Sequence, residues 1–291
     1  MLRNWKFDML NGKQYWLFAS IVIFLCINFV SFGCQIDYID LSTTPSYNAP
    51  THGNQRIFLI SFAHGEVHER NQNYLAFSAL NKGIDTIISY RKRHIDEGWY
   101  KQNKAILDMP RGAGYWLWKP YFIFETLKIM SPNDILFYVD SGVYLKNSVE
   151  KIIKMLNNSD TEMVLFGNYH TNRHFSKRDA FDIMGVNYDH RNDLQLDAST
   201  LAIKKTPNSC DFIKKWLDYC CIERVLTDSA SQAPEFEDFK DHRHDQAILT
   251  LLLNKYPDPC IKVLRWNDWK DLNIFAHHRR VQANLPITRS N

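Results

Sequence analysis

Apolar residues along the chain follow two spacings, one typical of buried strands and one typical of helices. Short, nearly continuous apolar runs predict strands at residues 56–63, 84–90, 134–139, 161–166, 199–204 and 260–264. Apolar positions at helical spacing predict helices at residues 71–82, 120–130, 149–156, 209–225 and 244–255. Because strands alternate with helices, the pattern predicts an α/β domain with a mostly parallel sheet flanked by helices.

Residues 15–34 have a different pattern, because they are apolar along almost their whole length. Their only ionisable side chains are Tyr15 and two cysteines. A helix of about 20 residues spans the ~30 Å of hydrocarbon in a bilayer. Arg3, Lys6 and Lys13 precede this stretch, and no Lys or Arg occurs in residues 35–55. The positive-inside rule therefore predicts a cytoplasmic N-terminus and export of the rest of the chain.

These patterns predict four regions. They are a cytoplasmic tail (1–14), a transmembrane signal anchor (15–34), a stem (35–54) and a globular domain (55–291). The stem assignment rests on the Ser, Thr, Pro, Asn and Gly residues of the segment 41–54. The alternative to an anchor is a cleaved signal peptide, but no A-x-A-like cleavage site follows the apolar run.

Composition excludes some classes of protein. The chain is 45% hydrophobic and 23% charged, which argues against general disorder. Its formal charge of +3 gives no support for nucleic-acid binding by the whole chain. The globular domain has four cysteines, which allow two disulfides in three pairings: Cys210, Cys220, Cys221 and Cys260. No C-x-x-C motif occurs, so a zinc site with thiolate ligands has no support.

The first candidate for chemistry is Asp140-Ser141-Gly142, directly after the strand predicted at 134–139. Ligands of parallel α/β sheets bind outside the carboxyl ends of the strands. A carboxylate there is suited to hold Mg²⁺ or Mn²⁺ beside a substrate phosphate, and Gly142 would let a ligand approach the backbone closely. The same residue types are also common in ordinary turns that end a strand.

The second candidate is the run from Gly112 to Pro120, GAGYWLWKP. The faces of Trp116 and Trp118 suit stacking on a base or a sugar ring, and Lys119 precedes a helix start where it would meet a diphosphate. The alternative is a corner of the core in which both indoles simply pack.

Two further candidates lie near the C-terminus. Asp245 and Gln246 open the helix predicted at 244–255, where a carboxylate and an amide suit recognition of sugar hydroxyls or proton transfer from one. A cap at the helix start is the alternative role of Asp245. His277 or His278 could supply one metal ligand, or both could belong to a solvated basic tail.

Three segments carry a resemblance to a known family: RGAGYWLWKPYFIFETL, NDILFYVDSGVYL and HRHDQAIL. Together they resemble a family of nucleotide-sugar-dependent glycosyltransferases of the GT-A fold, over about residues 56–278. The resemblance implies a GT-A-like, Rossmann-type domain with a nucleotide-sugar donor and a glycan, protein or lipid acceptor. The segments 176–179 and 195–199 add weaker support, the first as a candidate acceptor loop.

The resemblance also implies roles for single residues. Asp140 stands where GT-A enzymes have the first carboxylate of an Asp-x-Asp metal motif, but Gly142 replaces the second carboxylate. Asp140 would then bind Mn²⁺ or Mg²⁺ with a C-terminal histidine (His277 or His278) and the diphosphate, or would hydrogen-bond the ribose without metal. Asp245 and Gln246 resemble an Asp-Gln pair that lines the donor sugar and the acceptor.

We therefore expect a glycosyltransferase with Asp140 and Asp245 as catalytic residues. Its donor site would be formed by Trp116, Trp118, Lys119, Asp140, Gly142 and Gln246. The anchor implies a single-pass type II membrane protein, in the Golgi or endoplasmic reticulum lumen of a eukaryotic cell. Two alternatives remain open. One is a catalytically inactive protein of the same fold that binds sugar or nucleotide; the other is a Rossmann-like enzyme such as a methyltransferase.

Overall fold

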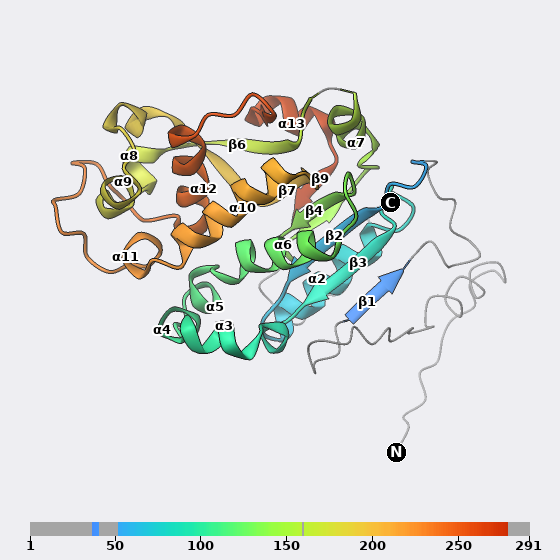
Figure 1. The fold of residues 1–291 in the computed structure, drawn as a ribbon, viewed down its shortest axis with the longest axis horizontal. Coiled ribbons are helices and arrows are strands. Elements are labelled where there is room, and N and C mark those ends of the chain that lie inside the picture. Colours follow the sequence, from blue (N-terminus) through green and yellow to red (C-terminus); the bar gives the residue numbers. More distant parts are fainter. Residues whose placement is uncertain (1–36, 41–51, 159, 279–291) are drawn as a thin grey trace, which may run out of the picture.

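The structure is a computed structural model that describes residues 37–40, 52–158 and 160–278 (Figure 1). Within these residues, a seven-stranded sheet has the order β1-β3-β2-β4-β7-β6-β8, and β5 pairs with β9 in a second sheet. The strands are β1 (Asp37–Asp40), β2 (Ile57–Phe62), β3 (Thr86–Tyr90), β4 (Ile135–Val139), β5 (Val143–Leu145), β6 (Met163–Thr171), β7 (Leu194–Lys204), β8 (Ile261–Leu264) and β9 (Phe275–His277).

The helices cover both faces of the large sheet (Figure 1). They are α2 (Glu66–Ser78), α3 (Glu97–Gln102), α4 (Lys104–Leu107), α5 (Gly112–Tyr115), α6 (Trp118–Ile129), α7 (Glu150–Asn157), α8 (Asn172–Phe175), α9 (Arg178–Met184), α10 (Pro207–Cys220), α11 (Glu223–Leu226), α12 (His244–Lys255) and α13 (Trp266–Leu272), with 3₁₀ turns at η2 (Lys92–His94) and η3 (Tyr188–Asn192). The predicted alternation of strands and helices is confirmed.

Two hydrophobic cores lie on opposite faces of the sheet. Successive side chains of a strand point to opposite faces, and β2 shows this clearly. Phe58 and Ile60 join the core beneath α6, α10 and α12, whereas Ile57 and Leu59 join the core beneath α2, α7 and α13. All four side chains are buried. Burial on both faces explains why these strands read as continuous apolar runs rather than as alternating ones.

The direction of β7 departs from a simple parallel sheet. β2 runs parallel to β3 and β4, and β6 runs parallel to β8, but β7 lies antiparallel between β4 and β6. Its register with β6 shifts between the pairs Leu165–Leu201 and Phe166–Asp197. The extra residues form a bulge beside the end of β4, where Ser199 O accepts a hydrogen bond from Asp140 N at 2.8 Å.

The predicted tail (1–14) and anchor (15–34) lie outside the described residues. Of the predicted stem, Asp37–Asp40 form β1, which pairs antiparallel with β3, so the sheet begins inside that range. None of the helices in the described part of the chain is long and apolar enough to cross a bilayer. The four cysteines of the domain are free thiols, so neither of the two disulfides allowed by the sequence is formed.

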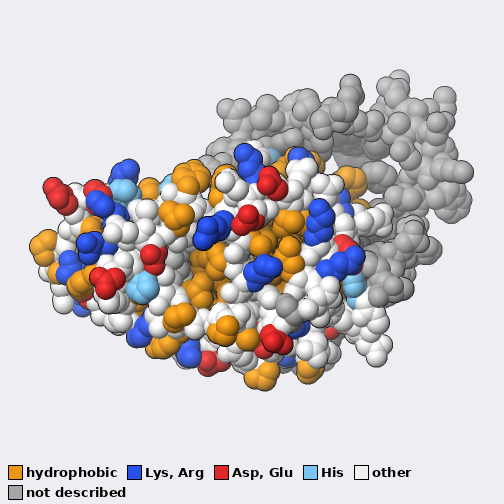
Figure 2. All heavy atoms as spheres, turned by 90° about the horizontal axis from the view of Figure 1, so that it is seen from above, with side chains coloured by type: hydrophobic (Ala, Val, Ile, Leu, Met, Phe, Trp, Pro, Cys, Tyr) orange, Lys and Arg blue, Asp and Glu red, His pale blue; other side chains and the backbone are white. Residues whose placement is uncertain are grey.

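One face of the molecule mixes apolar and charged side chains (Figure 2). Hydrophobic side chains gather near its middle, and Lys, Arg, Asp and Glu side chains lie around them. Over the described surface as a whole, the most exposed large apolar side chains include Phe77 (61%), Tyr169 (67%) and Leu194 (59%). A single exposed apolar side chain is ordinary in a folded protein. Such a residue bears on function only where its neighbours also suit a ligand.

Candidate active site

A buried lysine joins two carboxylates at the carboxyl end of β4. Lys119 Nζ lies 2.8 Å from Asp245 Oδ2 and 3.5 Å from Asp140 Oδ1, and it donates a hydrogen bond to Ala198 O at 3.0 Å. The side chains of Lys119 and Asp245 are 4% and 6% exposed, whereas that of Asp140 is 31% exposed. Asp140 is therefore the member of this cluster that a ligand in solvent can reach.

Each member of the cluster is placed by the start or the end of an element. Asp140 directly follows β4, Lys119 is the second residue of α6, and Asp245 is the second residue of α12. The positive end of the α12 dipole favours a carboxylate in its first turn. Trp216 Nε1 donates to Asp245 O at 2.9 Å and holds this turn against α10. The sequence prediction of a carboxylate at the rim of the sheet is thus matched by the fold.

Burial and charge act on these groups in opposite directions. Burial lowers the pKa of Lys119, but the negative charges of Asp140 and Asp245 outweigh it and leave that pKa raised. Burial raises the pKa of Asp245 to about 6, against the opposing effect of Lys119. Burial also raises the pKa of Tyr138 well above its usual value, so its hydroxyl stays protonated and donates to Asp140 Oδ1 at 2.5 Å.

One oxygen of Asp245 is held by charge alone. Its Oδ2 is buried, lies 2.8 Å from Lys119 Nζ in an ion pair, and has no hydrogen-bond partner among the residues that the structure describes. A buried carboxylate oxygen without hydrogen bonds is costly. The cluster therefore holds an acceptor that is not fully satisfied within the fold.

The amide of Gln246 is fixed by a chain of polar side chains. Gln246 Nε2 donates to Gln195 Oε1 at 2.9 Å, and Gln195 Nε2 donates to Ser176 Oγ at 2.9 Å. Ser176 Oγ donates in turn to Asn172 Oδ1 at 3.2 Å. Because Gln195 and Ser176 are buried, this chain sets the orientation of the Gln246 side chain. It also connects two segments that the sequence singled out, 176–179 and 195–199.

The backbone before Lys119 forms a left-handed turn. Five successive residues have positive φ: Gly112 (58°), Ala113 (52°), Gly114 (103°), Tyr115 (52°) and Trp116 (59°). Left-handed conformation costs roughly 1–2 kcal/mol for each residue other than glycine. Such strain persists only where surrounding contacts impose it, and it is most common at functional sites.

Contacts from a distant segment hold this left-handed turn. Arg111 forms ion pairs with Asp228 at 2.8 Å and with Asp241 at 2.7 Å, and Tyr115 OH donates to Asp228 at 3.1 Å. His244 Nε2 lies 3.0 Å from the other oxygen of Asp228. Burial lowers the pKa of His244 to about 4, so this imidazole is neutral at pH 7. The start of α12 and the turn before α6 therefore share one polar cluster.

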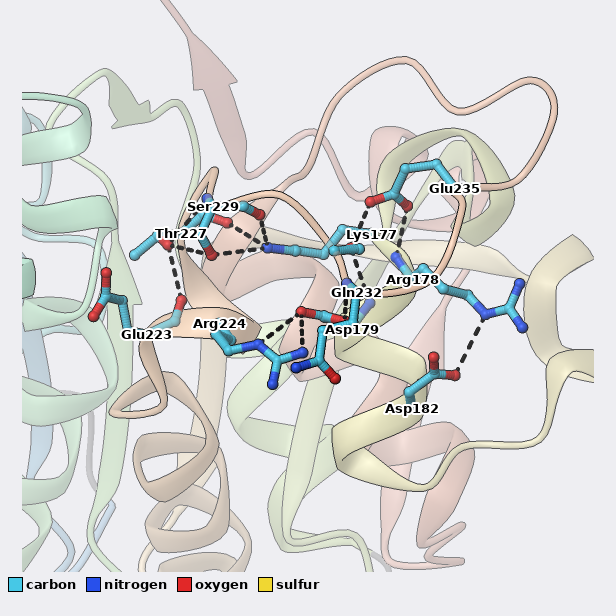
Figure 3. Close-up of polar contacts among 11 residues, drawn as sticks. Lys177, Arg178, Asp179, Asp182, Glu223, Arg224, Thr227, Ser229, Gln232 and Glu235 are labelled. Atoms are coloured by element: carbon cyan, nitrogen blue, oxygen red, sulfur yellow. Dashed lines mark hydrogen bonds and ion pairs between the residues drawn. The ribbon is translucent and has the colours of Figure 1, made fainter.

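The irregular segment between α11 and α12 is tied to α9 and α11 (Figure 3). The buried Lys177 ammonium donates to Thr227 O at 3.2 Å and to Ser229 O. Asp179 accepts from Arg224 at 2.7 Å and 3.0 Å and from Gln232 N at 3.0 Å. Lys177 and Asp179 thus serve the fold in a segment that the sequence suggested as a candidate acceptor loop.

The two predicted tryptophans occupy different environments. Trp118 is 5% exposed, stacks on Phe62 with ring centroids 3.9 Å apart, and donates from Nε1 to Gly112 O at 2.9 Å. Trp116 is partly buried and lies against His244, with ring centroids 5.1 Å apart. The core alternative therefore describes Trp118 well, and Trp116 is the better placed of the two to meet a ligand.

The remaining predicted residues lie at the rim. A Cβ at Gly142 would have no heavy atom within 4 Å beyond its chain neighbours, so this position is open. Gly142 O accepts from His278 N at 3.0 Å, and Val143 pairs with His277 in the small sheet. The histidines predicted as metal ligands therefore lie next to the segment that carries Asp140, and His277 is exposed.

The described part of the site offers few ligands to a divalent cation. Among residues 37–40, 52–158 and 160–278, no three His, Cys, Asp or Glu side chains are grouped so that they could hold a metal ion. The ammonium of Lys119 also lies 3.5 Å from Asp140 Oδ1, and a positive charge so close to the carboxylate disfavours a cation there. The described residues do not by themselves fit a metal site.

Sequence reasoning missed several residues of this site. Tyr138, Gln195 and His244 carry hydrogen bonds that orient Asp140, Gln246 and Asp228. Tyr138 lies in β4, two residues before Asp140, and side chains two residues apart in an extended strand point to the same face. This spacing could have indicated Tyr138 from the sequence. The contacts of Gln195 and His244 depend on the tertiary fold, and no local spacing indicates them.

No family model matches the chain, and no curated protein matches it. Solved structures with a similar fold include mouse xyloside xylosyltransferase 1, with 10% identity, a TM-score of 0.42, and coverage of 72% of this chain and 84% of that one. A glycosyltransferase involved in glycosylation of the major capsid of PBCV-1 has 10% identity, a TM-score of 0.36, and coverage of 77% and 94%. The bifunctional glycosyltransferase WbbM has 8% identity, a TM-score of 0.43, and coverage of 75% and 40%. All three TM-scores lie below 0.5, so these structures assign no function to this chain.

Proposed function

We propose that this protein is a glycosyltransferase that moves a sugar from a nucleotide-diphosphate donor to an acceptor hydroxyl. The observation that carries the proposal is the cluster of Lys119, Asp140 and Asp245 at the carboxyl end of β4, with Asp140 reaching solvent. Ligands of α/β sheets bind at this edge. The resemblance of the segments around all three residues to GT-A glycosyltransferases supports the same reading.

The transfer reaction needs a bound donor, a positioned acceptor hydroxyl and stabilisation of the charge that develops. The acceptor oxygen forms a bond to the anomeric carbon and loses its proton, while the bond to the diphosphate breaks and the diphosphate keeps the electron pair. Catalysis then needs the donor and the acceptor held in line and the developing charges stabilised. A rigid polar cluster beside an open glycine suits this task. Asp140 and Gly142 would face the donor, and Gln246 would hold hydroxyl groups of the sugar or the acceptor.

Lys119 has a different role in this proposal from the phosphate partner predicted from sequence. Its ammonium is buried, and its contacts with Ala198, Asp140 and Asp245 direct it into the protein. We therefore assign Lys119 as a positioning residue that fixes both carboxylates. Asp245 would act on the acceptor side, where a pKa of about 6 suits a group that accepts a proton near neutral pH. Because its side chain is only 6% exposed, the acceptor hydroxyl would have to enter the cluster to reach it.

Two expectations from the sequence enter the proposal as separate hypotheses. Mn²⁺ or Mg²⁺ would be held by Asp140 together with the diphosphate of the donor, and residual activity after chelation measures whether such an ion is used. The apolar segment 15–34 would anchor the domain as a type II membrane protein on the lumenal side of the Golgi or endoplasmic reticulum. Protease protection of the domain in sealed microsomes tests this orientation.

A second candidate function is a binding protein of the same fold without catalysis. Gly142 stands in the place of a second carboxylate, and this observation favours the candidate. Both functions predict binding of a nucleotide sugar, but only a transferase breaks the sugar–phosphate bond.

Release of nucleoside diphosphate from a panel of nucleotide sugars separates the two functions. The panel is run with Mn²⁺, with Mg²⁺ and with chelator, and S-adenosylmethionine is included to cover the methyltransferase alternative. A transferase releases nucleoside diphosphate from at least one donor, slowly with water and faster with an acceptor. Binding of a donor without release would establish the inactive alternative.

A further inference from the structure

A group of aromatic side chains lies on the surface beyond the candidate active site. We call Tyr169, His170, Phe175 and Trp266 the aromatic platform. The rings of Tyr169 and His170 have centroids 4.5 Å apart, those of His170 and Phe175 are 4.4 Å apart, and those of Tyr169 and Trp266 are 5.4 Å apart. Tyr169 is 67% exposed, the largest exposed fraction among the exposed large apolar side chains of the described residues. The platform is therefore continuous, and its central ring faces solvent.

A bulge in β6 presents this platform to solvent. The pairing of β6 with β7 is interrupted between Gly167 and Thr171, so the intervening residues leave the ladder. Asn168 fastens the bulge, because its Nδ2 donates to Leu196 O at 3.0 Å and its Oδ1 accepts from His170 N at 2.7 Å. Asn168 is itself buried. Tyr169 is therefore exposed by a bulge whose backbone is held by hydrogen bonds of the buried Asn168 side chain.

The strand order places the platform in line with the candidate active site. β4, β7, β6 and β8 are consecutive neighbours, and the edge that carries Asp140 at the end of β4 continues through Asp197 in β7 to the bulge of β6. β8 runs parallel to β6, and Trp266 follows its carboxyl end. Because neighbouring strands lie about 4.8 Å apart, β6 lies about two strand spacings, roughly 10 Å, from β4 across the sheet. Tyr169 lies further out along β6, beyond the pairs Phe166–Asp197 and Gly167–Leu196.

The chemistry of the platform suits a carbohydrate chain. A pyranose ring presents C–H groups on its faces and hydroxyl groups around its edge, so it stacks on an aromatic face and hydrogen-bonds to polar groups beside it. Burial and the Arg243 cation lower the pKa of His170, so its imidazole is uncharged at pH 7. Arg243 lies over the Phe175 ring at 4.8 Å and adds hydrogen-bond donors at the edge of the platform.

We propose that the aromatic platform binds the saccharide chain of the acceptor, one or more sugar units away from the hydroxyl that reacts. The proposal rests on the transferase function proposed above. If the reacting hydroxyl lies beside Asp140, the rest of the acceptor chain can extend along the edge of the sheet toward Tyr169. The platform would favour an acceptor that is already an oligosaccharide over a monosaccharide or a bare hydroxyl. Tyr169 would be the residue that contributes most to this preference.

Binding of free oligosaccharides tests this proposal without any donor. The protein is applied to a printed glycan array, and the best-bound oligosaccharide is titrated against three variants. Tyr169→Ala removes the ring, Tyr169→Phe keeps it, and Phe77→Ala removes an exposed ring of similar accessibility from α2 as the matched control. We expect the affinity to fall about three- to tenfold in Tyr169→Ala and to be retained in the other two variants.

The outcomes separate this proposal from the transferase function. A wild-type protein that binds no glycan on the array, or a Tyr169→Ala variant that binds as well as wild type, overturns the aromatic platform even if nucleotide sugars are turned over. Conversely, glycan binding that depends on Tyr169 supports the platform even if no donor is hydrolysed. Where transfer is measured, Tyr169→Ala is expected to raise KM for the oligosaccharide acceptor while donor hydrolysis with water is unchanged.

Discussion

The ammonium of Lys119 lies 2.8 Å from a carboxylate oxygen of Asp245, and both side chains are almost wholly excluded from solvent. The two residues open different helices, α6 and α12, whose first turns meet beside the end of β4. Removing two charges from water costs several kcal/mol each, and their attraction seldom returns much more than this. The pair is therefore better explained by the task of positioning Asp140 and Asp245 than by stability alone.

Removal of the Lys119 charge should strongly destabilise the protein. Lys119→Met leaves the buried Asp245 carboxylate without its counter-ion, and we expect the free energy of unfolding to fall by about 3–5 kcal/mol. Urea unfolding measures this change. Lys214→Met is the control, since Lys214 pairs with Asp218 on the surface and such pairs contribute about 0–1 kcal/mol.

A double variant shows whether this cost comes from the unpaired charge. Lys119→Met combined with Asp245→Asn should recover part of the lost stability, because the amide needs no counter-ion. Equal losses in the single and double variants would instead assign the cost to packing of the lysine side chain.

The raised pKa of Asp245 predicts a dependence of stability on pH. Burial raises this pKa to about 6, whereas an exposed Asp has a pKa of about 3.9. The folded protein therefore binds more protons than the unfolded chain between about pH 4 and pH 6, and this group makes the free energy of unfolding fall as pH rises through that window. Asp245→Asn should remove this contribution. If wild type and Asp245→Asn show the same dependence of unfolding free energy on pH in urea, Asp245 is not the group with the raised pKa.

Alanine should destabilise the protein at Gly114 but not at Gly142. At Gly114, φ is +103° and a Cβ would lie 2.8 Å from Leu107 Cα, so Gly114→Ala should cost about 1–3 kcal/mol of stability. Gly142 has open space for a Cβ, so Gly142→Ala should change stability by less than about 0.5 kcal/mol. If the donor approaches the backbone at Gly142, donor KM should rise in Gly142→Ala although the fold is intact.

Loss of Asp179 should release the segment between α11 and α12. Asp179 accepts hydrogen bonds from Arg224 and from Gln232 N, and Asp179→Asn weakens both. We expect faster amide hydrogen exchange in residues 227–243. Asp182→Asn, on the same helix α9, contacts Arg178 and Tyr188 instead and serves as the control. Equal exchange in both variants would show that Asp179 does not hold the segment.

Much of the fold could be predicted from the sequence because burial on both faces of the sheet leaves continuous apolar runs. β2 and β4 lie within one residue of the predicted strands, and α12 begins and ends at the predicted residues. The direction of β7 could not be predicted in this way, because an apolar run carries no sign of the direction of its neighbours. The split of the helix predicted at 209–225 into α10 and α11 was also missed.

In the candidate site, too, the residues placed by local structure could be predicted and the contacts between distant segments could not. Asp140 was found from its place after a strand, and Asp245 from its place at a helix start, since each position follows from local structure. The contact of Lys119 with both carboxylates requires α6 and α12 to meet, which only the tertiary fold determines. The left-handed turn before Lys119 was not predicted, because its alanine, tyrosine and tryptophan gave no sign of positive φ.

The central claim is that the Asp140 carboxylate takes part in sugar transfer. The most direct test compares nucleoside diphosphate release by wild type, Asp140→Asn and Asp271→Asn, the last a substitution at an exposed carboxylate of α13. We predict that Asp140→Asn lowers kcat at least about 100-fold although the protein still folds, while Asp271→Asn retains wild-type activity. Full activity in Asp140→Asn would contradict the account.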